Sequence, residues 1–301
     1  MRHTLLFFWD GVGLGDDDPL VNPFATAELP HFTSLLGEKW YVRGRGTITT
    51  PRATLVPTDA NLGLDGRPQS ATGQATILTG RNVPAFVGEH FGPKPNDKVR
   101  EALAQGTLFS EAVAKGGTAA LLTPYPERYF AAIARGKSLY SAVPQAAVYA
   151  GLPLRTADDL RHGRALSPDF TGQGWRDHLG YADVPLLTTA EAGAQLATLA
   201  QSHTFSFFEH WPTDQLGHRG TIAEARTHLE RVDEVLGGLL ANWDETNGLL
   251  IITSDHGNLE EIGHRQHTRH PVPTILVGQN HAQLASHITD LTHIAAVVRQ
   301  W

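Results

Sequence analysis

Short apolar runs that stop abruptly at acidic or turn-forming residues recur along the chain and predict buried strands. One run, Leu5 to Trp9, closes on Asp10-Gly11, and another, Leu249 to Thr253, is followed by Ser254-Asp255-His256-Gly257-Asn258. Runs that are apolar at every position are typical of strands buried on both faces, as in a parallel sheet. We therefore expect a central sheet whose strands deliver polar side chains where they end.

Helical periodicity fills the stretches between these runs. From Thr221, which forms a capping box with Glu224, apolar residues recur three and four apart and predict a long helix. Further helices are expected at Leu29–Leu36, Thr189–Gln201 and Ile288–Val298, and further strands at Thr204–Phe208 and Pro273–Val277. The alternation of predicted strands with predicted helices indicates an α/β fold with a largely parallel central sheet flanked by helices on both faces.

The pattern is irregular between residues 86 and 185, where Gly, Pro and aromatic residues are scattered and Arg and Lys are frequent. A length of 301 residues suits one α/β core with an insertion. We expect residues 1–85 and 186–301 to form that core, and residues 86–185 to be partly core and partly a small cap. The helix predicted at Leu108–Lys115 and the strand at Thr118–Leu122 would belong to the core.

The composition of the chain limits the kinds of function and metal site it can have. The hydrophobic fraction of 41% and the charged fraction of 18% are those of a globular protein, and the net charge of -7 argues against nucleic-acid binding. There is no Cys, which excludes thiolate metal sites and disulfides, so that any metal must be held by oxygen and imidazole. The N-terminal apolar run is too short for a signal peptide and no stretch approaches a membrane span, so a cytoplasmic location is expected.

Acidic and imidazole side chains gather where the predicted strands meet loops. They are three Asp and three His: Asp10, Asp214, His218, Asp255, His256 and His267. A single Asp-His pair is more often a surface hydrogen bond, but the carboxyl ends of parallel strands share one sheet edge, so that residues distant in sequence converge there. A set of three carboxylates and three imidazoles suits two divalent ions such as zinc or manganese.

Two other polar segments allow more than one interpretation. Gln69 to Arg81 is a loop entering a short helix, with Ser70 where backbone N–H groups and the helix dipole favour an anion; taken alone, an ordinary helix start explains it as well. The glycines after Asp10 do not form a dinucleotide fingerprint, because the Asp precedes them and no helical pattern follows. Asp16 to Asp18 could suggest a calcium loop, but a solvated turn before Pro19 is the simpler interpretation.

Taken together, these motifs resemble the alkaline phosphatase superfamily, and most nearly its cofactor-independent phosphoglycerate mutase and phosphopentomutase branch. The resemblance rests on Asp10-Gly11, the DxxGH run from Asp214, the DHGN run from Asp255 and the HTxxPVP run from His267. In those mutases the nucleophile lies in a segment similar to NSEVGHLNIGAGR. That segment matches Gln69 to Arg81 without a gap, which places Ser70 at the nucleophile and leaves Gly73, Gly80 and Arg81 at shared positions; Gln74 stands where the mutases have His.

The resemblance implies an alkaline phosphatase-like fold with two divalent metal ions, Mn or Zn. Asp214, His218 and His267 would hold one ion, and Asp10, Ser70, Asp255 and His256 the other. Ser70 would be the catalytic nucleophile, with Gly73, Gln74 and Arg81 as substrate-binding residues. Arg128, Arg135, Lys137 and Arg155 could replace part of the Arg- and Lys-rich substrate domain that the mutases insert and that has no clear counterpart here.

Three functions follow as hypotheses. The first is a phosphatase- or phosphodiesterase-type hydrolase that acts on a small phosphorylated metabolite through a phosphoserine, because a small cap would not keep water from the site. The alternative is a phosphomutase of the phosphoglycerate mutase or phosphopentomutase type, and the less favoured one is a metal-binding protein without turnover. Glu209 and Gly220 also resemble the nucleotide pyrophosphatase and phosphodiesterase branch, which leaves monoester or diester preference open.

Overall fold

A seven-stranded sheet runs through the middle of the molecule in the computed structural model, which describes residues 2–301. Its strand order is β2-β3-β9-β8-β1-β7-β4. The bounds are β1 (His3–Trp9), β2 (Ile48–Thr49), β3 (Ala53–Thr58), β4 (Ala119–Leu121), β7 (Phe205–His210), β8 (Gly248–Thr253) and β9 (Val272–Val277). The strands expected from the apolar runs are thus present, and β7 extends two residues further than its apolar run.

The sheet is parallel on one side and antiparallel on the other. β4, β7, β1 and β8 run parallel, whereas β9 is antiparallel to both β8 and β3, and β2 is antiparallel to β3. The largely parallel sheet expected from the sequence is confirmed. The reversed direction of β9 is a tertiary feature, because its apolar run resembles those of the parallel strands.

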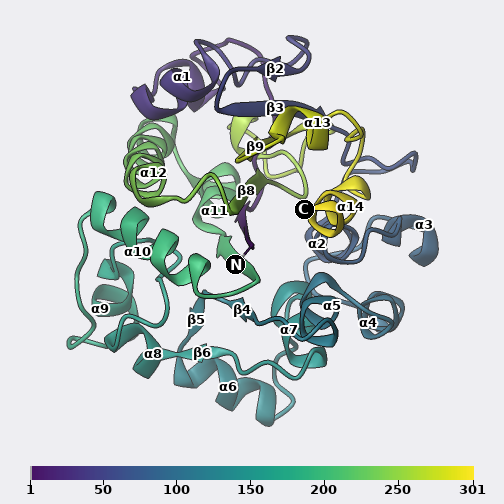
Figure 1. Cartoon of the computed structure of the whole chain (residues 1–301), viewed down its shortest axis with the longest axis vertical. Coiled ribbons are helices and arrows are strands. Elements are labelled where there is room, and N and C mark those ends of the chain that lie inside the picture. Colours follow the sequence, from purple (N-terminus) through teal and green to yellow (C-terminus); the bar gives the residue numbers. More distant parts are fainter. Residues whose placement is uncertain (1) are drawn as a thin grey trace.

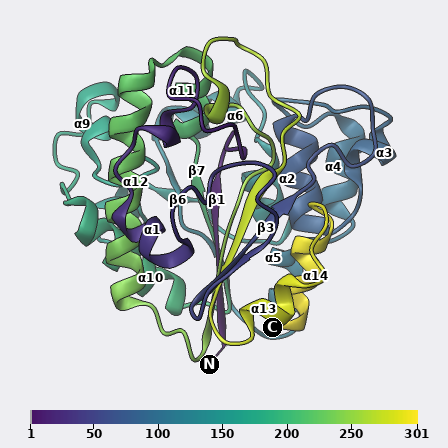
Figure 2. The ribbon, with the colours of Figure 1, turned by 90° about the horizontal axis from the view of Figure 1, so that it is seen from above.

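Both faces of the sheet are covered by helices, which Figure 2 shows on either side of the strands. Successive residues of β1 enter different cores: Leu5, Phe7 and Trp9 face one, and Leu6 and Phe8 the other. A strand buried on both faces has no reason to alternate apolar with polar residues, which explains the continuous run. The prediction of helices on both faces is confirmed.

The first core lies under α1, α10 and α12, and the second under α2, α5, α7 and α14 (Figure 1). The bounds are α1 (Pro30–Leu36), α2 (Ser70–Thr79), α5 (Leu108–Ala114), α7 (Ala142–Tyr149), α10 (Thr189–Gln201), α12 (Ile222–Asn242) and α14 (His293–Gln300). The Thr221–Glu224 capping box predicted for α12 is present. The closing helix begins at His293 rather than Ile288, because Ile288 and Leu291 are buried in the turn before it.

The stretch from 86 to 185 contributes to two parts of the molecule. β4, α4 (Asp97–Ala104), α5 and α7 belong to the main sheet and the second core. A separate two-stranded sheet, β5 (Pro124–Tyr125) with β6 (Arg155–Thr156), lies beside α6 (Glu127–Ala134), α8 (Ala157–Arg161) and α9 (Gln173–Leu179). This smaller part has a core of its own, made of Ala157, Leu160, Trp175 and Val184. The exact limits of a cap stay a prediction.

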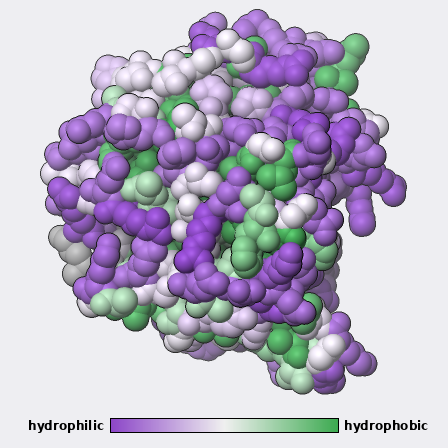
Figure 3. All heavy atoms as spheres, turned by 90° about the vertical axis from the view of Figure 1, so that its right-hand side faces the viewer, coloured by the Kyte–Doolittle hydropathy of each residue, from purple (hydrophilic) through white to green (hydrophobic). Residues whose placement is uncertain are grey.

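The outer surface is mostly polar. Hydrophilic side chains cover much of the face in Figure 3, and apolar groups lie between them in small clusters. Asp16 and Asp17 are exposed and pair with Arg43 and Lys39, in agreement with a solvated turn. Within residues 2–301, no helix is long and apolar enough to cross a membrane.

A buried histidine pair joins β7 to α12. The Nδ1–H of His210 donates to the Pro168 carbonyl at 2.7 Å, so that its Nε2 accepts a hydrogen bond from the Nε2–H of His228, 2.8 Å away. The His210 ring also stacks on Phe170 at 4.3 Å between centroids. Burial lowers the pKa of His210 well below its usual range, and burial together with the nearby Arg231 lowers the pKa of His228 to about 4.

This pair should make the fold sensitive to acid. Between pH 6.5 and about 4 the unfolded chain protonates His228 while the folded protein does not, so stability should fall as the pH is lowered through this window. The loss should reach about 3 kcal/mol at most. In urea unfolding with chelator present, His228→Gln should show a weaker pH dependence than the wild type, while the exposed His178→Gln should keep the full dependence. Equal pH slopes in all three proteins would contradict this account.

Candidate metal centre

The predicted ligands meet at one edge of the sheet because of the strand directions. β1, β7 and β8 are parallel and end together, so that Asp10, Asp214 and the Asp255-His256 pair follow them at that edge. His267 was expected among residues that follow strands, but it precedes β9. Because β9 is antiparallel, it begins where its neighbours end, and His267 reaches the same edge.

Asp214 and His218 lie on one face of the short helix α11 (Pro212–Arg219). Their spacing of four residues is the helical neighbour distance, and His218 Nε2 lies 3.4 Å from Asp214 Oδ2. Pro212 occupies the first turn of this helix, where a missing N–H costs nothing. The DxxGH spacing is therefore the spacing that turns both side chains toward one point.

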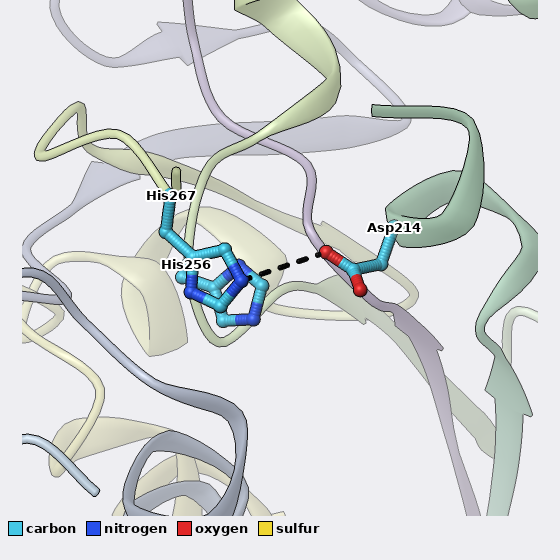
Figure 4. A group of neighbouring side chains, drawn as sticks. All are labelled: Asp214, His256 and His267. Carbon is cyan, nitrogen blue, oxygen red and sulfur yellow. Dashed lines mark ion pairs between the residues drawn. The ribbon is translucent and has the colours of Figure 1, made fainter. Parts of the chain in front are cut away.

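The first group of ligands consists of Asp214, His218 and His267. His267 Nε2 lies 3.2 Å from His218 Nε2 and 3.8 Å from Asp214 Oδ1; Figure 4 shows the carboxylate of Asp214 directed at the His267 ring. The Nδ1–H of His267 donates to the Pro68 carbonyl at 2.7 Å, which leaves Nε2 with its lone pair. Burial and the neighbouring His256 lower the pKa of His267 to about 4. A neutral imidazole of this kind is a metal ligand.

The second group consists of Asp10, Asp255 and His256, with Ser70 beside them. His256 Nε2 lies 3.5 Å from Asp10 Oδ1, 3.6 Å from Asp255 Oδ2 and 3.1 Å from Ser70 Oγ. Within residues 2–301, Asp10 Oδ1 and Asp255 Oδ1 are buried without a hydrogen-bond donor. Buried carboxylate oxygens are costly unless they are paired, and a cation would supply the missing partner.

His256 stands between the two groups rather than within one. Its ring stacks on that of His267 with centroids 3.6 Å apart, as Figure 4 shows. His256 belongs to two groups of three potential ligands, one with Asp214 and His267 and the other with Asp10 and Asp255. Within each group the ligand atoms lie within 4.8 Å of one another. The structure thus brings all six predicted side chains together, and they form two overlapping donor sets.

The electrostatics of the centre favour cations. Burial, followed by the charges of Asp255 and Asp214, raises the pKa of Asp10 well above its usual range. Burial and the charge of Asp214 also raise the pKa of Asp255 to about 7. Carboxylates that repel one another in a desolvated place are stabilised in their ionised form by a divalent cation. The donor set of carboxylates and neutral imidazoles fits such ions.

Ser70 opens α2 at this centre. Gln69 is the extended residue before the helix, so that Ser70 is the first helical residue and its Oγ points to His256. Gly73 is required for close packing, since a Cβ there would lie 2.8 Å from Asp255 Cβ. Gln74 Nε2 donates to Asp255 Oδ2 at 3.3 Å. Gly73 and Gln74 therefore contact Asp255.

Arg81 is not brought to the centre. It follows the opposite end of α2, and its guanidinium bonds to the side chain of Gln105. Arg155 is also occupied elsewhere, 3.6 Å from Asp159. A ten-residue helix separates its two ends by about 15 Å, which explains why adjacency in the motif does not bring Arg81 to the site.

Known proteins are similar in sequence to part of this chain. Residues 184–300 match the family model of the Metalloenzyme superfamily. A 2,3-bisphosphoglycerate-independent phosphoglycerate mutase of Thermomicrobium roseum is 36% identical over 97 residues, which cover 30% of this chain and 18% of that protein. One from Rhodopseudomonas palustris is 39% identical over 85 residues, 26% of this chain and 17% of that protein. The matched segments thus span less than a fifth of these two curated relatives.

Solved structures share the fold over nearly the whole chain. The cold-active alkaline phosphatase of a psychrophilic Shewanella sp. has a TM-score of 0.56 at 11% identity, with 98% of each chain covered. The alkaline phosphatase of the Antarctic bacterium TAB5 has a TM-score of 0.53 at 12% identity, with 100% of this chain and 98% of that chain covered. The alkaline phosphatase-like fold expected from the motifs is confirmed.

A buried carboxylate that was not predicted from the sequence joins the segments that carry the predicted ligands. Glu260 Oε2 accepts hydrogen bonds from the backbone N–H groups of Gly13 at 2.9 Å and Asn258 at 2.8 Å. Its Oε1 accepts from the Thr268 hydroxyl and lies 3.1 Å from His270 Nδ1. Burial alone would raise the pKa of Glu260, but the bonds from His270 and Thr268 outweigh it and lower the pKa.

Glu260 therefore joins the two ends of the β8–β9 connection, which carry His256 and His267, and links this connection to the loop that carries Asp10. Asn258 adds a second link, because its Nδ2 donates to Asp214 Oδ1 at 2.7 Å. Ser254 adds a third, since its Oγ accepts from Val12 N and donates to the His256 carbonyl, both at 2.9 Å. The signal that could have revealed Glu260 is its place two residues after the DHGN run, but an acidic residue in a loop usually faces solvent.

Gly257 is needed for space rather than for its conformational freedom. Gly257 is not among the glycines with positive φ, so its backbone conformation is open to other residues. A Cβ at this position would lie 2.2 Å from Thr268 Oγ1 and 2.3 Å from Glu260 Oε1. The glycine permits the hydrogen-bonded bridge between Gly257 and Thr268.

A cleft of about 460 Å³ opens onto the centre. Ser70, Asp214, His218 and His267 form part of its lining. Arg67 and Arg265, which the sequence did not single out, line the same cleft. Side chains from loops far apart in the sequence meet here, so no local motif indicates them.

Gly257→Val should weaken metal binding although glycine binds no metal. The added side chain would displace Thr268 and Glu260, and with them His267 and His256. We expect at least a tenfold loss of Mn²⁺ affinity by titration calorimetry, while Ala282→Val, an equal enlargement on the surface, should bind as the wild type does. Full metal occupancy in the Gly257 variant would refute this packing argument.

Glu260→Ala should lower both stability and metal affinity. Two buried backbone N–H groups would lose their acceptor, at a cost of about 1–3 kcal/mol each. The melting temperature of the metal-free protein should therefore fall, and Mn²⁺ affinity should fall by about 10- to 100-fold. The neighbouring Glu261→Ala is the matched control. Equal behaviour of the two variants would show that Glu260 does not position the loops.

Proposed function

We propose that this protein is a metal-dependent phosphoryl-transfer enzyme of the phosphatase or phosphodiesterase type that acts through a phosphoserine at Ser70. The observation that supports it most is the position of Ser70 Oγ, 3.1 Å from His256 Nε2 in a cleft shared with Asp214, His218 and His267. A hydroxyl that opens a helix beside two donor sets is placed to attack a phosphate bound there.

The proposed assignment of ligands keeps the two halves expected from the motifs. Asp214, His218 and His267 would hold one ion, and Asp10, Ser70, Asp255 and His256 the other. Two divalent cations in these places would lower the pKa of the Ser70 hydroxyl and offset the charge that develops on the phosphoryl oxygens. Manganese or zinc suits the mixture of carboxylate and imidazole.

The residues of the chain then carry the reaction in two steps. Ser70 Oγ forms a bond to phosphorus, its proton passes to solvent, and the bond to the leaving group breaks; the leaving oxygen takes a proton from water. In the second step a water oxygen bonds to phosphorus and the Oγ–P bond breaks, which releases phosphate and restores the Ser70 hydroxyl. The backbone N–H groups of Ser70 and Ala71 at the start of α2 would bind the phosphoryl oxygens, whereas that of Thr72 already donates to the Phe91 carbonyl.

Hydrolysis rather than isomerisation is supported by access to the site. Ser70 is partly exposed, and the exposed residues Arg265 and Gln266 stand along the same cleft. A mutase must hold its phosphoenzyme away from water while the product turns, and an open cleft does not favour this. The names of the curated relatives favour the mutase instead, which is why that reaction is the second candidate.

A non-catalytic metal protein is the least supported function. It would bind Mn²⁺ without releasing phosphate from any ester, and a metal-binding role alone gives no reason for a hydroxyl at the centre. A cytoplasmic location stays a prediction.

Ser70→Ala tests the proposal directly. The wild type with Mn²⁺ or Zn²⁺ should release nitrophenol from nitrophenyl phosphate or the bis-ester, and the variant should lose at least about a thousandfold in kcat while its fold and metal content persist. Mass spectrometry of acid-quenched wild type should find phosphate on Ser70. The exposed Ser286→Ala is the control. Unchanged turnover in the Ser70 variant would disprove the nucleophile, and isomerisation of a phosphoglycerate or pentose phosphate without release of phosphate would favour the mutase.

A further inference from the structure

A chain of hydrogen bonds runs from the protein surface to Glu260 and has no part in the proposed reaction. Its members are Asp16, Arg43 and His270. The side chain of His270 is 16% exposed; its Nδ1 lies 3.1 Å from Glu260 Oε1, and its Nε2 lies 2.9 Å from Arg43 Nη1. His270 therefore contacts the buried carboxylate at one edge of its ring and a surface arginine at the other.

The two partners fix the tautomer of His270. Burial would raise the pKa of Glu260, but the hydrogen bonds from His270 and Thr268 lower it, so that this carboxylate is ionised and can only accept. The guanidinium of Arg43 can only donate, so that Nε2 of His270 presents its lone pair to it. His270 is thus a neutral imidazole that donates inward from Nδ1. Glu261 Oε2 lies farther from Nε2, at 3.5 Å.

Arg43 is held for this contact at two points. Its Nε and Nη2 donate to the two carboxylate oxygens of Asp16 at 2.6 and 2.7 Å, which leaves Nη1 for His270. Its backbone N–H donates to the Gly15 carbonyl at 2.8 Å. An exposed ion pair adds little to stability by itself, but a paired contact of this kind sets the plane of the guanidinium. The direction of Nη1 is therefore fixed from the protein surface.

The inner end of the chain reaches two segments of the metal centre. Glu260 Oε1, which faces His270, also accepts from the hydroxyl of Thr268, the residue after His267. Glu260 Oε2 accepts from the backbone N–H of Gly13, in the loop after β1. The carboxylate is fully buried, so that water does not readily replace a lost donor. A change at His270 should therefore move both segments through Glu260.

We propose that His270, oriented by Arg43, is a positioning residue of the metal centre: its Nδ1–H holds Glu260 so that the segments carrying Asp10 and His267 meet in the arrangement that binds the ions. This inference rests on the proposed function, because it takes the ligands assigned there. His270 itself binds no ion, since both of its ring nitrogens are engaged. Residues that act in this way through a hydrogen-bonded neighbour tune the affinity of metal sites.

Two replacements of the same shape separate the hydrogen bond from packing. The amide nitrogen of Asn can take the place of His Nδ1, whereas Leu has the shape of Asn without a donor. By titration calorimetry, His270→Leu should lose at least about tenfold in Mn²⁺ affinity and His270→Asn should stay within about threefold of the wild type. The visible spectrum of the Co²⁺-loaded protein should change in the Leu variant and be restored in the Asn variant. His264→Leu, which removes a histidine bonded to Glu261 in the same loop, should leave both readouts unchanged.

A double-mutant cycle tests the part played by Arg43. Without this arginine, Nε2 of His270 is free to take a proton and turn toward Glu261, which draws the ring away from Glu260. Arg43→Ala should therefore lower Mn²⁺ affinity by about threefold in the wild type, but should have no effect beside His270→Asn, which has no group in the place of Nε2.

The outcomes separate this inference from the proposed function. Equal affinities and spectra of the Leu and Asn variants, or an equal effect of Arg43→Ala in both backgrounds, would overturn the inference and leave the metal centre standing. Wild-type protein that binds neither Mn²⁺ nor Co²⁺ would contradict the proposed function and the inference together. Tight binding of Mn²⁺ without release of phosphate from any ester would contradict the proposed reaction alone.

Discussion

Mutual repulsion among buried carboxylates is the constraint around which this protein is arranged. Asp10 and Asp255 lie in a desolvated place within reach of the charge of Asp214, and the pKa values of Asp10 and Asp255 are raised as a result. Oxygens of both residues are buried without a donor in the described part of the chain. Such a cluster is unfavourable for the fold in isolation, and bound cations convert it into a stabilising one.

The directions of the strands and the buried carboxylate of Glu260 hold this cluster in place. Parallel β1, β7 and β8 bring the loops that follow them to one edge, and the loop after β8 turns back at that edge into antiparallel β9. Glu260, in the loop between β8 and β9, accepts hydrogen bonds from two residues of its own loop and from Gly13 in the loop after β1. Unlike the ligands, Glu260 is satisfied by the protein itself, which accounts for its lowered pKa. The two kinds of buried acid therefore have different roles: one leaves oxygens available for cations and the other organises the loops.

The candidate site is built by loops at one edge of the sheet, apart from the two cores that stabilise the fold. A common fold can therefore support different reactions. The two apolar cores depend on β1 and β8 being buried on both faces, and these cores use none of the ligand side chains. The cleft is lined by residues from loops of different origin, with Arg67 before α2 and Arg265 before β9. Similarity of fold to alkaline phosphatases thus leaves the choice of substrate to the cleft.

The sequence by itself determined the strands, the main helices and which six Asp and His side chains meet at one edge of the sheet. Continuous apolar runs and three-four periodicity report local burial, and Asp and His after such runs indicate an edge where parallel strands end. Tertiary structure alone decided that β9 is antiparallel, which is why His267 reaches this edge although it precedes a strand. The tertiary structure also placed Arg81 away from the site and brought Arg67 and Arg265 to the cleft. It buried Glu260 among the loops. These features depend on distances between segments far apart in the chain, and no local pattern of residues encodes such distances.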